Sequence, residues 1–261
     1  MFDMAALDAS LAGTIFAGNL HFSSVTDSTN TDALSAACNA APHGAVYFAD
    51  EQLAGRGRGD HAWYSASGEG LYASVLLRPR IPSIRLPLVP LAAGLAAADS
   101  IHAVARLTVD LRWPNDLLLG PRKAGGILVE THTEGNMVAF AVIGIGINVH
   151  QRGFDPDLAT LATSLDLESK RKVSRQDLLV ALLESLEREM LGLLDPAANE
   201  TIFARVEQAS TWVRGRQVEV HGPQACTGVT DGLDKNGFLR VRTEDGLVTV
   251  QTGGIRAVEI G

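Results

Sequence analysis

Residues 55–63 read Gly-Arg-Gly-Arg-Gly-Asp-His-Ala-Trp, or GRGRGDHAW. Glycine lets the backbone adopt positive φ and approach a ligand closely, and it weakens any helix or strand that contains it. Arginine adds a planar fork of N–H donors that matches a carboxylate or a phosphate. The stretch is therefore predicted to be a loop that folds over an anion. Its composition also fits a solvated turn, so other segments have to distinguish the two.

A dinucleotide-binding phosphate loop is the familiar glycine-rich alternative, and the residues that follow disfavour it. That motif needs a third glycine that opens a helix, whereas Asp60, His61 and Trp63 follow here. A short Gly-x-Gly pattern alone is a weak signal.

The bulk composition is that of an ordinary globular protein. The 261 residues are 46% hydrophobic and 20% charged, enough for one large core or for a large and a small domain. A formal net charge of −8 argues against broad, sequence-independent DNA binding, which needs a basic face. Cys38 and Cys226 lie far apart, without the spacing of a disulfide framework or a zinc site. We find no signal peptide and no apolar run of membrane-spanning length, so we expect a cytoplasmic protein.

Hydrophobic patterning predicts a chain of mixed helices and strands. Two helix starts have capping-box spacing, Thr29 with Asp32 and Ser174 with Asp177. The second opens an amphipathic helix that Asp195-Pro196 ends. An alanine-rich helix is predicted over 91–104. Strands are predicted at 45–49, 71–77, 107–111, 126–129 and 138–147, with a hairpin turn over 131–136.

The pattern changes near residue 214 to short alternating strands, at 218–220, 238–242 and 247–250. Asn236-Gly237 and Asp245-Gly246 are hairpin signals between them. We therefore predict two domains, a large one over 1–213 and a small β-barrel over 214–261.

Arg112-Trp113-Pro114-Asn115-Asp116 is a second candidate site. Proline removes a backbone donor and restricts Trp113 to an extended conformation, which places Asn115 and Asp116 in a fixed turn just past a strand. The pair suits a polar ligand or its magnesium. A structural turn that ends the strand is the alternative.

Two further segments carry groups suited to anions. Lys123 stands ahead of Gly125, Gly126 and a buried strand, where it either grips an anion or is simply exposed. Residues 144–148 read Gly-Ile-Gly-Ile-Asn, a strand with small residues and one amide, and glycines there can equally serve close packing. No Ser/His/Asp grouping points to a covalent intermediate. The shared feature is anion recognition, which suits the stabilisation of charge during acyl activation.

Taken in order, these segments resemble biotin protein ligase. The matching pieces are Asp27-Ser28-Thr29-Asn30, Gln52 with Gly55-Arg56-Gly57-Arg58, Trp63, Trp113-Pro114-Asn115-Asp116, Lys123 with 126–130, and 144–148. The resemblance implies an α/β (α+β) fold, a mixed sheet with packed helices of the class II aminoacyl-tRNA synthetase-like, biotin–lipoate ligase type, followed by an SH3-like barrel. It also implies a reaction of biotin with MgATP to biotinyl-5′-adenylate and pyrophosphate, and transfer to a lysine of a biotin carboxyl carrier protein.

The resemblance also implies which residues do this. Arg58 and Lys123 would bind the biotin carboxylate and α-phosphate, and Asp116 would orient magnesium or the incoming amine. Trp63, Asn115 and Asn148 would serve the adenine and phosphate end. The full set of implied ligand-binding residues is Ser28, Thr29, Asn30, Gln52, Gly55, Arg56, Gly57, Arg58, Trp63, Asn115, Lys123, Gly126, Leu128, Gly144 and Asn148.

Three positions depart from the family pattern. His61 follows Asp60 where a second Gly-Arg pair is usual, Arg112 replaces a lysine in what we expect to be a tolerant surface exchange, and Ala124-Gly125 loosens the segment after Lys123. Only 26 residues precede Asp27, which makes a DNA-binding repressor role unexpected. We expect no membrane partner, and a monomer or a homodimer. A lipoate-type ligase or transferase and a non-catalytic carrier-binding protein are the alternatives.

Overall fold

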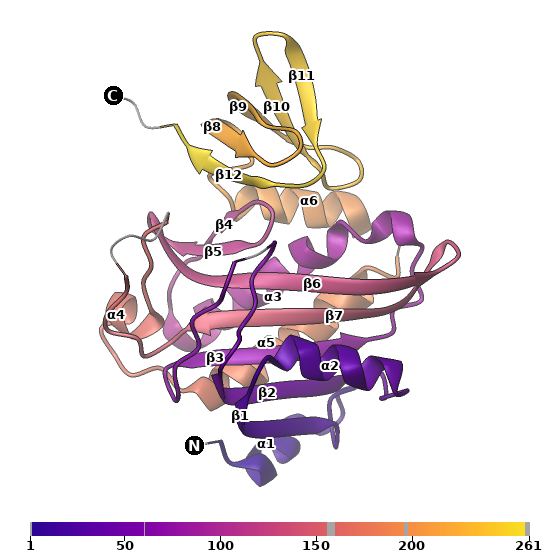
Figure 1. The fold of residues 1–261 in the computed structure, drawn as a ribbon, viewed down its shortest axis with the longest axis vertical. Coiled ribbons are helices and arrows are strands. Elements are labelled where there is room, and N and C mark those ends of the chain that lie inside the picture. The colour runs from indigo at the N-terminus through magenta and orange to yellow at the C-terminus, as the bar shows by residue number, and fades with distance from the viewer. Residues whose placement is uncertain (1, 60, 156–159, 196–197, 259–261) are drawn as a thin grey trace.

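The computed structural model describes residues 2–59, 61–155, 160–195 and 198–258. A seven-stranded sheet forms the body of the molecule, helices pack against it, and a five-stranded sheet lies beyond one of its edges (Figure 1). This architecture confirms the predicted α/β class, with a mixed sheet followed by a small all-β unit.

The large sheet is mixed. Its strands, in spatial order, are β1 (Leu20–Thr26), β2 (Ala45–Gln52), β3 (Gly70–Leu77), β7 (Met137–Asn148), β6 (Arg122–Glu134), β5 (Asp116–Leu119) and β4 (Asp110–Arg112). β1 and β2 run parallel, and every other neighbouring pair runs antiparallel. The strand predicted over 107–111 is shifted to β4, a short edge strand. The turn predicted over 131–136 contracts to Gly135-Asn136, because 131–134 continue β6.

The two faces of the sheet bury different partners. The helices are α1 (Met4–Ser10), α2 (Thr29–Cys38), α3 (Leu88–Ala105), α4 (Leu165–Ser169), α5 (Arg175–Gly192) and α6 (Ala198–Gln208), with a 3₁₀ turn at Ser83–Arg85. Val75 and Leu77 of β3 join the main core with α3 and α5, whereas Leu76 joins a second cluster with Ala33 and Ala37 of α2. Successive side chains of a strand point to opposite faces, so α2 covers the face opposite α3 and α5.

The two predicted capping boxes have different outcomes. Ser174 caps α5 and its side chain accepts from the N–H of Asp177, as predicted. The prediction for Thr29 and Asp32 is wrong: α2 begins one residue earlier, with Ser28 at its N-cap and no side-chain capping bond. The carboxylate of Asp32 instead accepts from the Thr26 hydroxyl at 2.7 Å. α5 ends at Gly192, ahead of the predicted stop, and Pro196 lies outside the described residues.

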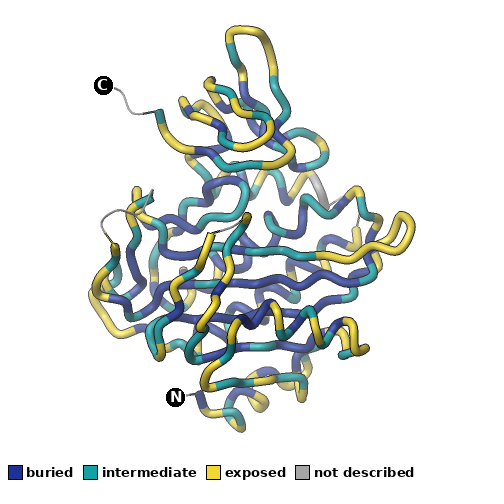
Figure 2. The backbone as a smooth tube through the Cα atoms, in the orientation of Figure 1, coloured by how far each residue is buried: buried dark blue, intermediate teal, exposed yellow. Residues whose placement is uncertain are grey.

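Helix α3 corrects one expectation from the sequence. It is long and apolar enough to cross a membrane by length and composition, although we expected no such run. Two thirds of it (67%) is buried inside the protein, the pattern of a core helix. Figure 2 shows the same concentration of burial along the central strands, with exposure at the β6–β7 turn.

The small sheet is formed by the C-terminal strands. They are, in spatial order, β11 (Gly246–Val250), β10 (Leu239–Thr243), β9 (Cys226–Leu233), β8 (Arg214–His221) and β12 (Gly254–Ala257). The sequence predicted β8, β10 and β11 and missed β9 and β12. The indole Nε1 of Trp113 donates to the Gly237 carbonyl at 3.4 Å, and Val218 and Leu239 belong to the same apolar cluster as α3. The small sheet is thus packed onto the large unit through a continuous core.

Candidate active site

The main cavity, of about 740 Å³, lies on the face of the large sheet that also carries α2. All of the residues proposed as catalytic or ligand-binding line it, with the exception of Gly55. They come from the α2 start, the end of β2, the loop over 55–63, the β4–β5 turn, β6 and β7. The chain therefore brings together side chains more than a hundred residues apart.

Glycines keep the sheet surface open beneath this cavity. A Cβ at Gly144 would stand 2.1 Å from Oδ1 of Asn30, and a Cβ at Gly146 would stand 2.6 Å from the Trp63 ring. Gly126, on the neighbouring strand, also faces Trp63 and Lys123. Any side chain at these positions would fill the space that Asn30 and Trp63 now occupy, so the glycine pattern of β6 and β7 makes the hollow.

One end of the cavity carries a network of uncharged polar groups. Oε1 of Gln52 accepts from the Thr29 N–H at 2.9 Å and from the Thr29 hydroxyl at 3.1 Å, while Nε2 of Gln52 donates to Ser65. The Ser74 hydroxyl lies 2.8 Å from that of Thr29 and donates to Oδ1 of Asn30. Since buried polar groups need partners, this network fixes the side chains in place before a ligand arrives.

An ion pair joins this polar end to the glycine-arginine loop. Nδ2 of Asn30 donates to the Glu130 carboxylate at 2.7 Å, and the same oxygen pairs with the Arg56 guanidinium. Glu130 was not among the predicted site residues. Its carboxylate ties Arg56 of the loop to α2 and β6.

Arg58 reaches from the loop to the opposite wall. Its Nη1 donates to Oδ1 of Asn115 at 3.3 Å and to the Gly253 carbonyl at 2.9 Å. Nδ2 of Asn115 donates in turn to the carbonyl of Ile127, which fixes the amide. Burial lowers the pKa of Arg58, and the nearby Asp116 carboxylate opposes that shift. An arginine remains charged even so, so Arg58 presents a partly desolvated positive charge to the cavity.

Asp116 lies between two cations. Its Oδ1 accepts from Nζ of Lys123 at 2.6 Å, and its Oδ2 accepts from Nη2 of Arg112 at 2.7 Å. Burial acts to raise the pKa of Asp116, but the charges and hydrogen bonds of Lys123 and Arg112 hold it below its usual range. Asp116 therefore stands ionised, with its charge shared between two partners.

Trp63 covers the glycine floor. Nζ of Lys123 lies 5.4 Å from the Trp63 ring centre, and the ring faces Gly126 and Gly146. Its Nε1 is buried and finds no hydrogen-bond partner in the described part of the chain. The indole thus lies beside Lys123, with its Nε1 turned toward Gly146 of the sheet.

Gly55 does not line the cavity, which separates it from the other residues of the predicted set. A Cβ there would stand 2.4 Å from the Trp63 carbonyl, and the Trp63 N–H donates to the Gly55 carbonyl at 2.8 Å. Gly55 closes the neck of the loop. His61 lines the cavity, exposed, and its backbone carbonyl accepts from the Gly57 N–H at 2.7 Å.

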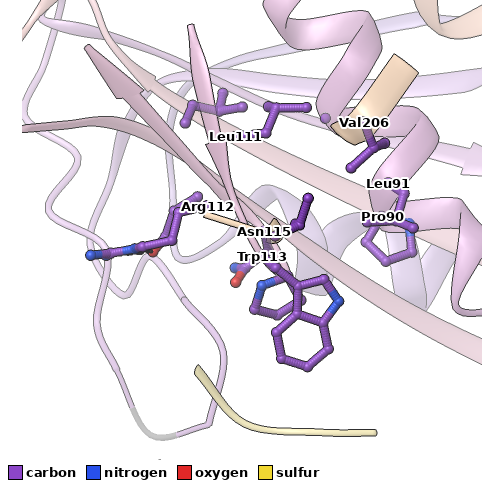
Figure 3. Close-up of a pocket in the computed structure, with 12 residues that line it drawn as sticks. Pro90, Leu91, Leu111, Arg112, Trp113, Asn115 and Val206 are labelled. Atoms are coloured by element: carbon purple, nitrogen blue, oxygen red, sulfur yellow. Dashed lines mark hydrogen bonds and ion pairs between the residues drawn. The ribbon is translucent and has the colours of Figure 1, made fainter. Parts of the chain in front are cut away.

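Arg112 is buried, with 9% of its side chain exposed, so the expectation of a tolerant surface exchange is wrong. Leu91, Leu111, Trp113 and Val206 line a small cavity, and the Arg112 side chain extends away from Leu91 and Val206 (Figure 3). The Trp113-Pro114 turn was predicted to be fixed by its proline. Trp113 is buried in the same apolar cluster as Leu91, Leu111 and Val206, so packing also holds the turn.

The small C-terminal sheet, which was predicted as a barrel and is called the barrel below, contributes a wall of the cavity that the sequence analysis missed. The cavity residues from this part of the chain are His221, Gly222, Thr252, Gly253, Gly254, Ile255 and Arg256. Ser74 and Tyr72 of β3 also line the cavity and were not predicted. The one signal for Ser74 was a lone polar residue inside an apolar strand. The barrel residues carried no signal, because the contact depends on how the two units pack.

The cavity is strongly cationic in a chain of net negative charge. Its charged lining residues are Arg56, Arg58, Arg112, Lys123, Arg256 and Asp116. Among the described residues, no group of three or more His, Cys, Asp or Glu side chains could hold a metal ion. The arrangement is suited to an anionic ligand with a polar, uncharged head.

Comparison with known proteins gives a consistent picture. Residues 22–148 match the biotin/lipoate A/B protein ligase family. The chain is 37% identical over 242 residues to the bifunctional ligase/repressor BirA of Bacillus subtilis, covering 91% of this chain and 73% of that protein. It is 33% identical over 238 residues to the biotin–[acetyl-CoA-carboxylase] ligase of Mycobacterium tuberculosis, covering 88% and 85%.

The fold is shared with solved structures as well. The biotin protein ligase of Aquifex aeolicus in complex with biotin and ATP superposes with a TM-score of 0.78 at 27% identity, covering 92% of this chain and 98% of that one. By the extent of these matches and the ordered motifs in its cavity, this chain belongs to the biotin/lipoate A/B protein ligase family.

Proposed function

We propose that this protein is a biotin protein ligase. In this reaction the carboxylate of biotin attacks the α-phosphorus of ATP, the bond to the β-phosphate breaks, and pyrophosphate leaves with the electron pair. The observation that carries the proposal is one continuous cavity with an uncharged polar network at one end and several cations at the other. Relatives named as biotin ligases support the same assignment.

The polar end suits the head of biotin. Ser28, Thr29 and Gln52 offer hydroxyl, amide and backbone groups in fixed positions, and burial makes each correct hydrogen bond count. Gly126, Gly144 and Leu128 leave room for an apolar ring and chain along the sheet. Arg56 and Gly57 form the part of the loop that closes over it.

The cationic end suits the carboxylate and the phosphates. Lys123 pairs with Asp116, and Arg58 bonds the neighbouring Asn115. Both cations line the cavity and can donate to oxygens that gain charge as the mixed anhydride forms. Such preorganised donors, aimed at developing charge, are the largest common source of rate enhancement. Trp63, Asn115 and Asn148 line the remaining wall, where the nucleoside would lie.

The second step is transfer to a carrier lysine. Its amine attacks the carbonyl of the adenylate, AMP leaves, and an amide forms with loss of a proton. Asp116 is the acidic residue among the described lining, which makes it the group suited to orient that amine. A biotin carboxyl carrier domain is the partner this proposal requires.

Magnesium fits this site only in the company of the nucleotide. Mg²⁺ in proteins is usually held by one or two carboxylates together with substrate phosphates. Both oxygens of Asp116 accept from Lys123 and Arg112, so Asp116 would orient the ion only together with the phosphates of the nucleotide. When bound, the ion supplies charge to the phosphates, and this chain's own residues supply the donors described above.

Pyrophosphate exchange tests the proposal. We expect exchange of labelled pyrophosphate into ATP that depends on biotin and is not supported by lipoate. Lys123→Ala should lower it on the order of 10²- to 10³-fold, the usual cost of one preorganised donor. Lys172→Ala, which removes an exposed lysine, is the matched control and should leave the rate unchanged. Exchange supported by lipoate, or normal exchange in a folded Lys123→Ala protein, would overturn the assignment.

A further inference from the structure

The buried Arg112 lines the cavity and is held by contacts with three different residues. Its Nε and Nη2 lie 3.0 and 2.7 Å from the same oxygen of Asp116, Oδ2. Nη2 also donates to the Thr160 hydroxyl at 3.0 Å. The guanidinium lies 5.2 Å from the centre of the Trp212 ring, and that tryptophan is 7% exposed. Three different groups therefore fix one planar side chain.

The Arg112 guanidinium and Lys123 each bond a different oxygen of the Asp116 carboxylate. Because Nε and Nη2 share Oδ2, rotation of the carboxylate would break two bonds at once, and Oδ1 is left pointing to Nζ of Lys123 at 2.6 Å. The side chains of Arg112 and Asp116 are 9% and 15% exposed, whereas Lys123 is 27% exposed and borders the cavity. Asp116, which pairs with Lys123, is thus held in place by Arg112.

Trp212 links this arrangement to the start of the barrel. Arg216 of β8 also lies over the Trp212 ring, at 4.3 Å from its centre. An aromatic face attracts each guanidinium, and Asp116 offsets the charge of Arg112. Trp212 and Thr160 therefore hold the planar guanidinium of an arginine. A lysine, whose ammonium is a single compact charge, could not make the same contacts.

We propose that Arg112 is a positioning residue: it acts through Asp116 to hold Lys123 where the adenylate forms, and Trp212 keeps the Arg112 guanidinium in place. This inference rests on the proposed function, because the kinetic measurements that test it follow the biotin-dependent reaction. Arg112 touches the carboxylate from the side away from Lys123, so its effect is expected on the rate of the chemical step. The affinity for the substrates, which is the same in the ground state and the transition state, should change little.

Steady-state kinetics of the biotin-dependent exchange reaction provide the first test. Arg112→Met keeps the aliphatic stem over Trp212 and removes the fork. We expect kcat to fall on the order of a hundredfold, the cost of a misplacement of about 1 Å at a catalytic group. The KM for ATP should stay within about twofold, as expected when uniform binding is unchanged. Arg112→Lys should recover only part of the loss. A raised KM for ATP with unchanged kcat would show that Arg112 binds the nucleotide, and would overturn the inference.

A double-mutant cycle with Asp116→Asn is the sharper measurement. If Arg112 acts through Asp116, the two substitutions should not be additive. Adding Arg112→Met to Asp116→Asn should then lower kcat by less than about twofold further, which is within the scatter of such cycles. The same hundredfold loss in both backgrounds would contradict it. Arg216→Met, which removes the other cation over Trp212, is the matched control with full activity expected. If the wild-type protein shows no biotin-dependent exchange, the proposed function fails, a result distinct from an additive cycle.

Discussion

At the scale of single residues, the site depends as much on missing side chains as on charged ones. Gly144 and Gly146 lie on β7 opposite Leu128 and Gly126 of β6. A Cβ at Gly146 would stand 2.6 Å from Nε1 and Cε2 of Trp63. The indole can therefore lie against the sheet beside Lys123 only because no side chain is there.

Gly146→Ala should push the Trp63 ring off the sheet and away from Lys123. Overpacking of this kind costs about 1–3 kcal/mol, which we expect to appear as a lower unfolding free energy in urea and a raised KM for ATP. Gly153→Ala is the control, because nothing lies within 4 Å of a Cβ there. Equal behaviour of the two variants would show that Trp63 does not depend on Gly146.

At the scale of elements, two helix starts with the same sequence signal are stabilised differently. Ser174 caps α5 locally, through the N–H of Asp177 at 3.1 Å. Ser28 holds the same N-cap position on α2, but the free N–H of Thr29 is satisfied by Gln52 from the end of β2. A distant side chain has replaced the local cap, which leaves Ser28 to line the cavity.

Ser174→Ala should lower the free energy of unfolding by about 1 kcal/mol, the usual cost of losing an N-cap. Ser28→Ala should cost less than about 0.5 kcal/mol, the low end for a lost cap, because its side chain makes no capping bond. It should weaken biotin binding instead. Urea unfolding and biotin titration of both variants check this pair. An equal loss of stability would mean that Ser28 is a conventional cap.

At the scale of the whole molecule, the barrel closes the site that the large sheet opens. The Gly253 carbonyl accepts from Arg58, which is 195 residues away in the chain. Residues 252–256 and His221 line the same cavity as the glycine-arginine loop. Because the two units share one apolar core, this wall is held by packing rather than by a tether.

Arg256→Ala should weaken ATP binding and leave biotin binding unchanged, because Arg256 lines the cavity from the barrel side. The residue is exposed, and exposed ion pairs are worth about 1 kcal/mol or less, so the KM for ATP should rise by about fivefold at most. Added salt should shrink the difference. Arg242→Ala, on the exposed outside of the barrel, is the control. A loss of biotin affinity in Arg256→Ala would contradict this division of the cavity.

The local sequence determined the central strands β2, β3, β6 and β7, the amphipathic α5 and the loop over 55–63, because periodicity and glycine chemistry act within a few residues. It also identified cavity residues such as Arg58 and Lys123, whose types suit anions wherever they lie. Tertiary packing decided that Arg112 is buried, that Gln52 caps α2, and that the barrel walls the site. Those outcomes depend on contacts between residues far apart in the chain, and such contacts leave no periodic trace in the sequence.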